Sequence, residues 1–173
     1  MKFLTLKIAG LNLRLELSKD NWAVFCQQKY AGFLKNGSPR PDFKVTVELL
    51  DSTRIKDIRF EFIGENHTKI FFPSSFKHFG MLNFAVKNSF AACLLRNKGC
   101  LIHASSSVIE NKAVLFAGVS GQGKSTIIRQ LRRRCLADDR SIIRFIGKRP
   151  FVYGSPFYEQ HNFAKIRSKF PLG

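Results

Sequence analysis

The chain has 173 residues, 45% of them hydrophobic, and 29 Lys and Arg face only 12 Asp and Glu, which gives a formal charge of +17. This content can build a real core in one domain, or in one domain with a small appendage, and no apolar run is as long as the roughly 20 residues of a membrane span. The amino terminus also lacks the basic-then-apolar pattern of a secretion signal, so we expect a cytoplasmic protein.

The positive charge would attract phosphates, nucleic acid or acidic protein surfaces without specifying which. No nucleic-acid recognition motif accompanies it, and the aromatic residues fall mainly at apolar periodic positions. We therefore predict no sequence-specific nucleic-acid binding, while an acidic partner and an oligomer stay open. The cysteines share no C-x-x-C spacing and have no histidine at zinc-finger spacing, which favours reduced, mostly buried thiols: Cys26, Cys93, Cys100 and Cys135.

Residues 1–75 predict a small α+β domain made of one sheet and one helix. Alternating leucines over 11–17 follow a strand over 3–9, and Gly10 between them indicates a tight hairpin with one apolar face. A helix and three further short strands follow before residue 75. His67 lies in a strand near a turn, and we interpret it as a solvated side chain rather than a ligand.

A connecting helix is predicted over 76–98, because apolar residues recur there at helical spacing. Two strands follow over 100–109 and 113–117, with a turn at Glu110-Asn111-Lys112 between them. The second strand leads directly into a glycine-rich loop. We therefore expect the first strand beside it as an antiparallel hairpin partner, rather than a helical crossover between the two.

The strongest motif of the chain is Gly118-Val119-Ser120-Gly121-Gln122-Gly123-Lys124-Ser125-Thr126, which matches the phosphate-loop pattern G-x-x-x-x-G-K-[ST]. Its glycines allow positive φ and let successive N–H groups approach phosphate oxygens at the start of a helix. Lys124 would reach the β- and γ-phosphates, and the Ser125 hydroxyl would ligate Mg²⁺. The motif predicts that the chain binds ATP or a related nucleotide with Mg²⁺. A glycine-rich turn that caps a structural helix is the alternative.

Three segments in this order resemble the catalytic region of the HPr kinase/phosphorylase family and its smaller relatives. They are Leu101–Ser106 with His103, the phosphate loop, and Leu136-Ala137-Asp138-Asp139-Arg140. The resemblance covers about residues 99–144 and implies a nucleotide-binding fold similar to that of phosphoenolpyruvate carboxykinase. The expected fold class is therefore mixed α/β (α+β), with the N-terminal sheet-plus-helix region followed by a P-loop kinase-like core over 99–173.

The resemblance also implies a role for each site residue. His103 would lie near the γ-phosphate, and Lys124 would neutralise charge on the phosphates. Asp139 would accept the proton of the incoming hydroxyl, while Asp138 would be its neighbour or a metal-linked partner beside Ser125. Together these roles imply an ATP-dependent kinase that phosphorylates a serine or another hydroxyl, on a protein or a small molecule. An acidic turn for the two aspartates and a hydrogen-bonded core histidine are the structural alternatives.

The geometric expectation is that His103, Lys124, Ser125 and Asp139 converge on one site. The hairpin would place the first strand beside the one that feeds the loop, and a strand returning after the helix would bring the aspartates alongside. The chain departs from the family in its short segment before Asp138 and in lacking a Glu-containing, Arg-Gly-rich segment. It also ends at 169–173 without an evident closing element.

These departures leave two interpretations of the domain and of its function. The domain is expected to be incomplete at its C-terminus, either as a naturally short relative or as a truncated reading frame. The function is that of a kinase, or that of a non-catalytic nucleotide-binding or interaction module whose basic surface engages an acidic partner.

Overall fold

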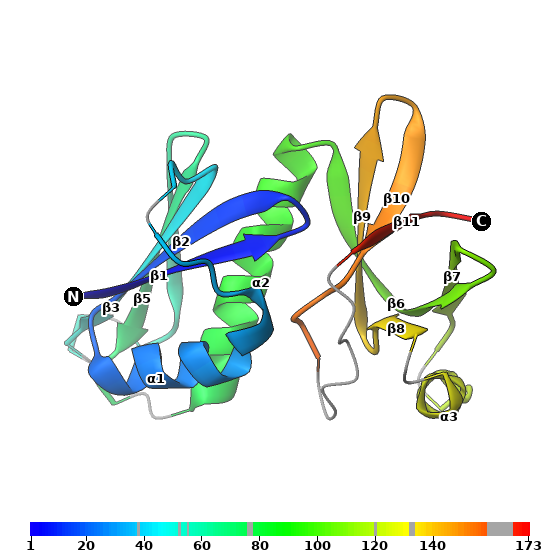
Figure 1. The fold of residues 1–173 in the computed structure, drawn as a ribbon. Helices are drawn as coiled ribbons and strands as arrows, with labels where there is room; N and C mark the ends of the chain where they lie inside the picture. The colour runs from blue at the N-terminus through cyan, green and yellow to red at the C-terminus, as the bar shows by residue number, and fades with distance from the viewer. Residues whose placement is uncertain are drawn as a thin grey trace. The chain divides into compact units, whose positions relative to one another are not determined.

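The computed structural model describes residues 1–37, 39–51, 53–54, 56–75, 78–119, 121–131, 134–158 and 168–173. The chain is of the mixed α and β class, as predicted, and divides into two compact units, Met1–Cys93 and Leu94–Gly173 (Figure 1). No helix of the described residues is long and apolar enough to cross a lipid bilayer.

The helices and strands that begin in the first unit are β1 (Lys2–Ile8), β2 (Leu11–Leu17), α1 (Asp20–Lys29), the 3₁₀ helix η1 (Ala31–Phe33), β3 (Phe43–Leu50), β4 (Arg59–Ile63), β5 (His67–Pro73) and α2 (Phe79–Arg96). The strands form a five-stranded sheet in the order β1-β2-β3-β5-β4. The predicted hairpin of β1 and β2 is confirmed, and its turn consists of Ala9 and Gly10, which both have positive φ. The pairs β2–β3 and β3–β5 are parallel, whereas β4 and β5 are antiparallel.

Aromatic contacts join α1 to the sheet of this unit and to α2. The alternating leucines of β2 are buried on one face of the sheet, and Trp22 of α1 meets Phe72 of β5 with ring centroids 5.4 Å apart. Phe25 of α1 stacks on Phe79 of α2 at 5.0 Å. The division between the units therefore falls inside α2, and not before it, as the ranges 1–75 and 76–98 had placed it.

The other face of the first sheet carries a polar network around Thr46. Its Oγ1 donates to Glu16 Oε2 at 3.1 Å and lies 2.9 Å from His67 Nε2. Because the hydroxyl hydrogen is used on Glu16, Nε2–H of His67 donates to Thr46. Burial, helped by the nearby charge of Lys44, lowers the pKa of His67. The interpretation of His67 as a solvated residue is wrong, since its ring is half-buried and hydrogen-bonded.

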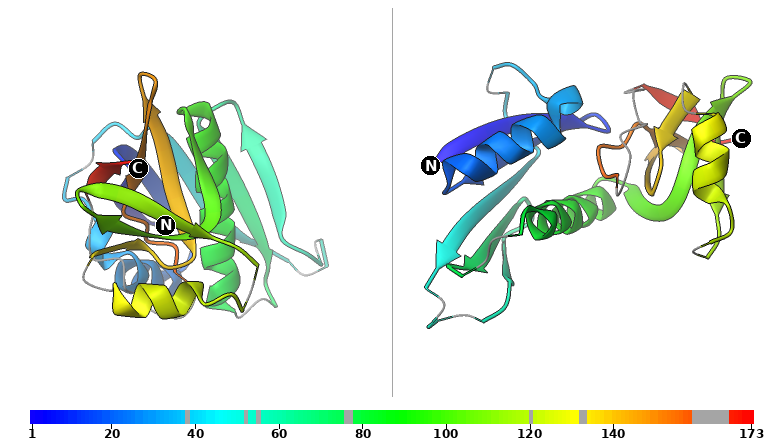
Figure 2. Two further views of the ribbon diagram at one scale, coloured as in Figure 1. Left: turned by 90° about the vertical axis from the view of Figure 1, so that its right-hand side faces the viewer. Right: turned by 90° about the horizontal axis from the view of Figure 1, so that it is seen from below.

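The second unit contains β6 (Gly99–Ile109), β7 (Lys112–Ala117), α3 (Lys124–Gln130), β8 (Cys135–Ala137), β9 (Arg140–Ile146), β10 (Arg149–Tyr153) and β11 (Lys169–Pro171). Its six-stranded sheet has the order β11-β10-β9-β6-β7, with β8 also paired to β6. β6 and β7 are antiparallel, as predicted from the turn between them. β6 curves along its length, and α3 lies beside it (Figure 2).

The last residues of the chain close this sheet into a ring of strands, which corrects the expectation that no closing element follows. β11 pairs antiparallel with β10, Leu172 forms a parallel bridge to Ala113 of β7, and the N–H of Gly173 donates to the Ala113 carbonyl at 3.1 Å. Phe170 and Leu172 pack on the buried cluster formed by Val108, Ala113, Leu136, Ile143 and Val152. A strand of three residues is too short to carry a periodic signal in the sequence.

The cysteines are mostly buried, as predicted. Cys26, Cys93 and Cys135 are buried, Cys100 is partly exposed, and none of the four forms a disulfide. Burial raises the pKa of Cys26 to about 12, and burial together with the charge of Asp138 raises the pKa of Cys135 to about 12. These two thiols therefore stay protonated at neutral pH and are poor nucleophiles.

Candidate functional site

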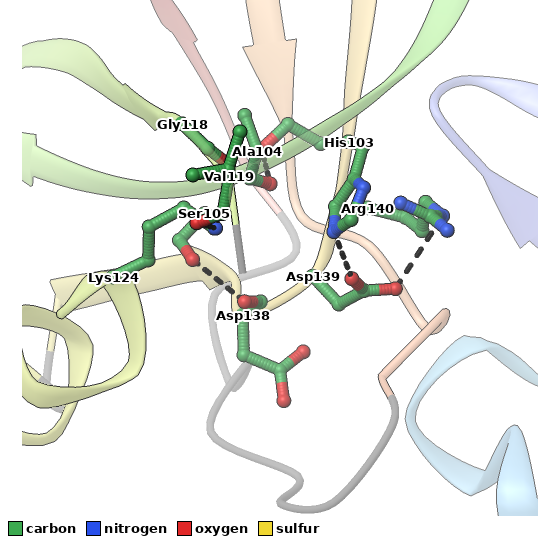
Figure 3. A network of polar contacts seen from close by, with 10 residues as sticks. His103, Ala104, Ser105, Gly118, Val119, Lys124, Asp138, Asp139 and Arg140 are labelled. Atoms are coloured by element: carbon green, nitrogen blue, oxygen red, sulfur yellow. Dashed lines mark hydrogen bonds and ion pairs between the residues drawn. The ribbon is translucent and has the colours of Figure 1, made fainter. Parts of the chain in front are cut away.

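β6 holds two distant segments beside its own residues His103 and Ala104, because it pairs with a different strand on each edge. On one edge it pairs with β7, and Ala104 stands opposite Ala117, the residue before Gly118. On the other edge it pairs with β9, and His103 stands opposite Arg140. The register therefore places the start of the phosphate loop and the Asp139-Arg140 segment on either side of His103 and its neighbour (Figure 3).

The loop after β7 has the backbone conformation that its glycines predict. Gly118, Gly121 and Gly123 have φ of 153°, 89° and 79°, and Gly123 is the N-cap of α3. A Cβ built at Gly121 or Gly123 would meet no atom within 4 Å, so conformation and not crowding requires glycine there. A Cβ at Gly118 would instead collide with Oε1 of Gln122.

Lys124 folds back over this loop. Its Nζ donates to the carbonyl oxygens of Gly118 at 2.7 Å and of Val119 at 2.8 Å. The ammonium group thus lies at the start of the loop, on the side where β7 ends. Ser120 and the side chain of Ser125 lie outside the described residues, so their predicted roles stay predictions.

His103 and Arg140 contact opposite oxygens of the Asp139 carboxylate. His103 Nε2 lies 3.1 Å from Oδ1, and Arg140 Nε lies 3.4 Å from Oδ2. The Asp139 side chain is only 10% exposed, whereas that of His103 is 58% exposed. The carboxylate is therefore a largely buried anchor that orients an accessible imidazole.

Asp138 is held by its backbone and directs its carboxylate elsewhere. Its carbonyl accepts a hydrogen bond of 2.6 Å from Ser105 Oγ. In Figure 3 the two aspartate side chains point to different sides of the chain, and only that of Asp139 meets His103. Burial and the negative charge of Asp138 raise the pKa of Tyr158. The two adjacent aspartates therefore have different surroundings: Asp139 contacts His103 and Arg140, whereas the charge of Asp138 acts on Tyr158. This difference is consistent with the separate roles that were predicted for them.

Serines of β6 and β9 position the site, a role that the sequence analysis missed. Ser107 Oγ donates to the Arg134 carbonyl at 2.9 Å, and Ser141 Oγ donates to the Ala104 carbonyl at 2.8 Å and lies 2.9 Å from Ser106 Oγ. These bonds fasten the segments on both sides of Asp138 where the β6–β8 register shifts. The signal was available, because a buried strand interrupted by Ser105-Ser106-Ser107 must satisfy three hydroxyls internally.

The predicted site residues are thus partly assembled. His103 and Asp139 are in contact. The loop begins after Ala117, which stands opposite Ala104, the residue that follows His103 on β6. Within the described part of the chain, the polar contacts of the Lys124 side chain go to its own loop and include neither His103 nor Asp139.

The chain matches no model of a known protein family, and no curated protein sequence matches it.

Proposed function

We propose that the second unit binds ATP with Mg²⁺ at residues 118–126 and transfers the γ-phosphoryl group to a hydroxyl. The acceptor would be a serine or another hydroxyl of a protein or a small molecule. Cysteines that form no disulfide suit a reducing compartment, and we expect the chain to act in the cytoplasm.

The observation that carries the proposal is the double register of β6. Ala104 opposite Ala117 and His103 opposite Arg140 put a phosphate-loop start, an accessible imidazole and a carboxylate at one place on the sheet. Phosphoryl transfer needs little more from a protein than in-line positioning, charge stabilisation and a carboxylate that orients the attacking oxygen. A glycine-rich turn with only a structural role would not need these partners beside it.

The residues present fit both groups that the reaction requires. Positive φ at Gly121 and Gly123, with no protein atom near a built Cβ, lets backbone N–H groups approach the phosphates of ATP. The hydroxyl of Ser125, the carboxylate of Asp138 and phosphate oxygens would supply hard oxygen donors of the kind that Mg²⁺ prefers. When bound, the metal ion would neutralise part of the phosphate charge.

In the proposed transfer, the acceptor oxygen attacks the γ-phosphorus while the bond to the bridging oxygen breaks. ADP leaves with that electron pair, and the acceptor proton passes to Asp139 directly or through one water. Lys124 gives up its hydrogen bonds to the carbonyls of Gly118 and Val119 and donates to phosphate oxygens instead. His103, held by Asp139, stabilises charge on the transferred group.

A second function is favoured by one observation, which is that both carboxylate oxygens of Asp139 already contact basic groups. A hydroxyl acceptor has to reach an oxygen that His103 or Arg140 now occupies. A module that binds nucleotide without transferring phosphate, and engages an acidic partner through its basic surface, does not need that exchange.

Titration of fluorescent ATP with Mg²⁺ into the full chain tests the shared first step. Lys124→Ala should lower the affinity at least about tenfold, because a charge-assisted contact to phosphate is lost. Lys112→Ala removes the same charge from an exposed position at the start of β7 and should leave binding unchanged. Equal affinity of the wild-type chain and Lys124→Ala would contradict both functions.

Release of labelled phosphate from [γ-³²P]ATP separates the two functions, because water can replace an unidentified acceptor. Kinase function predicts slow release that Asp139→Asn abolishes. ATP binding with no release above the Asp139→Asn level, also in the presence of serine-containing peptides, would favour the non-catalytic module.

A further inference from the structure

The turn between β9 and β10 carries exposed apolar and cationic side chains together. Phe145 and Ile146 are 46% and 45% exposed, and the next side chains along the chain, Lys148 and Arg149, are exposed as well. We call these four residues the β9–β10 tip. It projects beyond the ends of the neighbouring strands of its unit (Figures 1 and 2).

The tip is held in place from its base. The hairpin has Ile146 opposite Arg149, and the N–H of Phe145 donates to the Lys98 carbonyl at 2.8 Å. Arg144 Nε donates to the Asn97 carbonyl at 3.2 Å, just below the tip. The exposed side chains therefore lie on a hairpin that is already held in place. Binding to a surface does not carry the entropic cost of ordering a loose loop.

The charge around the tip is of one sign. Residues 94–173 contain 15 Lys and Arg against 4 Asp and Glu, and residues 140–158 contain no acidic residue at all. Exposed Lys98 adds a further cation on the turn that braces Phe145. An apolar pair surrounded by unopposed positive charge is complementary to a surface with an apolar interior and anionic groups outside it.

The first unit offers an internal contrast to this feature. The β4–β5 turn follows the same tripeptide, Phe62-Ile63-Gly64, with Phe62 and Ile63 58% and 44% exposed. There the next residue is Glu65, whereas Lys148 follows Gly147 at the tip. The two hairpins thus share exposed apolar residues and differ in charge.

We propose that the β9–β10 tip docks the protein on bilayer surfaces that contain anionic lipids. Phe145 and Ile146 enter the boundary between headgroups and acyl chains, and Lys148 and Arg149 contact anionic headgroups. Lys98 adds to the attraction from the adjacent turn. This inference is independent of the nucleotide site, which lies at the opposite end of β9.

A lipid surface suits the tip better than a macromolecular partner does. A stable protein interface buries about 800 Å² on each partner, which is far more than two half-exposed side chains supply. Nucleic-acid surfaces stack bases on accessible aromatic faces, but here Ile146 is aliphatic and Phe145 stands opposite Pro150. A bilayer, in contrast, can take up a small apolar group at its interface, and its anionic lipids attract each nearby cation.

Co-sedimentation of the full chain with vesicles tests the proposal. Vesicles of phosphatidylcholine with phosphatidylserine should bind the protein, and vesicles of phosphatidylcholine alone should bind it much less. Phe145→Ser/Ile146→Ser and Lys148→Glu/Arg149→Glu should each lower binding to the anionic vesicles at least about tenfold. The matched control, Phe62→Ser/Ile63→Ser, should bind as the wild type does, and circular dichroism checks that every variant is folded.

Three results would overturn the proposal. The first is equal vesicle binding by wild type and both tip variants. The second is loss of binding in the charge-reversed variant alone, which would mean diffuse attraction without insertion. The third is binding of duplex DNA that needs the tip while neither kind of vesicle binds, which would make the tip a nucleic-acid surface.

Discussion

His103 on β6 and Asp139 just before β9 are held with Nε2 and Oδ1 3.1 Å apart by strand register. His103 stands opposite Arg140 in the register of β6 and β9. Asp139, the residue before Arg140, is therefore close enough for its carboxylate to contact the imidazole. Arg140 closes the other side of the same carboxylate. The contact therefore depends on the pairing of β6 with β9.

Asp139→Asn should abolish phosphoryl transfer and retain ATP binding, because it removes the proton acceptor without changing the loop. The expected loss in rate is about 10²–10⁴-fold. Asp138→Asn is the matched comparison, since its side chain points to a different side, and higher Mg²⁺ should restore part of its activity. Full transfer by Asp139→Asn would remove this residue from the proposed chemistry.

Gly118→Ala should weaken ATP binding and lower the melting temperature. The φ of 153° is strained for a residue with a Cβ, at a cost of about 1–3 kcal/mol, and the Gln122 side chain would have to turn its Oε1 away from the new atom. Gly64→Ala, at φ of 61° in the first unit, is the control and should lose stability without losing ATP affinity. Isothermal titration and thermal melts separate the two effects; unchanged ATP binding by Gly118→Ala would contradict the cradle geometry.

Gly99→Ala should destabilise the second unit by about 1–3 kcal/mol through overpacking. A Cβ there would lie 2.7 Å from Arg144 Cγ and 2.7 Å from the Ile143 carbonyl oxygen. Adding Arg144→Ala should recover only part of this loss, because the carbonyl cannot move away. Gly80→Ala in α2, with nothing within 4 Å, should be neutral or slightly stabilising in the same urea titration.

Stability should fall as the pH drops below about 6.5, through His67. The pKa of His67 is lowered in the folded state by burial and by Lys44, so the unfolded chain binds the proton first. The loss therefore begins at the ordinary pKa of histidine, 6.5, and is complete below the lowered value. It should stay below about 1 kcal/mol, since the ring is only half-buried.

His67→Gln should flatten the melting temperature between pH 6.5 and 5 while keeping a hydrogen-bond donor for Thr46. Glu16 should produce a second, separate decline at lower pH. Burial acts to raise its pKa, but hydrogen bonds from Lys44 and Thr46 and the charges of Lys44 and Arg14 lower it overall from 4.5. An identical pH profile for His67→Gln and wild type would exclude the histidine as the source.

Local sequence patterns determined the features of this protein that depend on neighbouring residues. Alternation over 11–17 predicted β2, and the turn residues at 110–112 predicted the β6–β7 hairpin, because side-chain period and turn conformation are properties of a short segment. The same holds for the loop at 118–124, where glycine spacing alone indicates positive φ.

Only the tertiary structure decided which segments became neighbours. The change of β6 from β9 to β8 places Asp139 on His103, and it depends on serine hydroxyls that find carbonyls far along the chain. The closure of the ring by β11 and the parallel order β2-β3-β5 are likewise long-range pairings. Such pairings are selected by burial and hydrogen bonding over the whole unit, and no local periodicity encodes them.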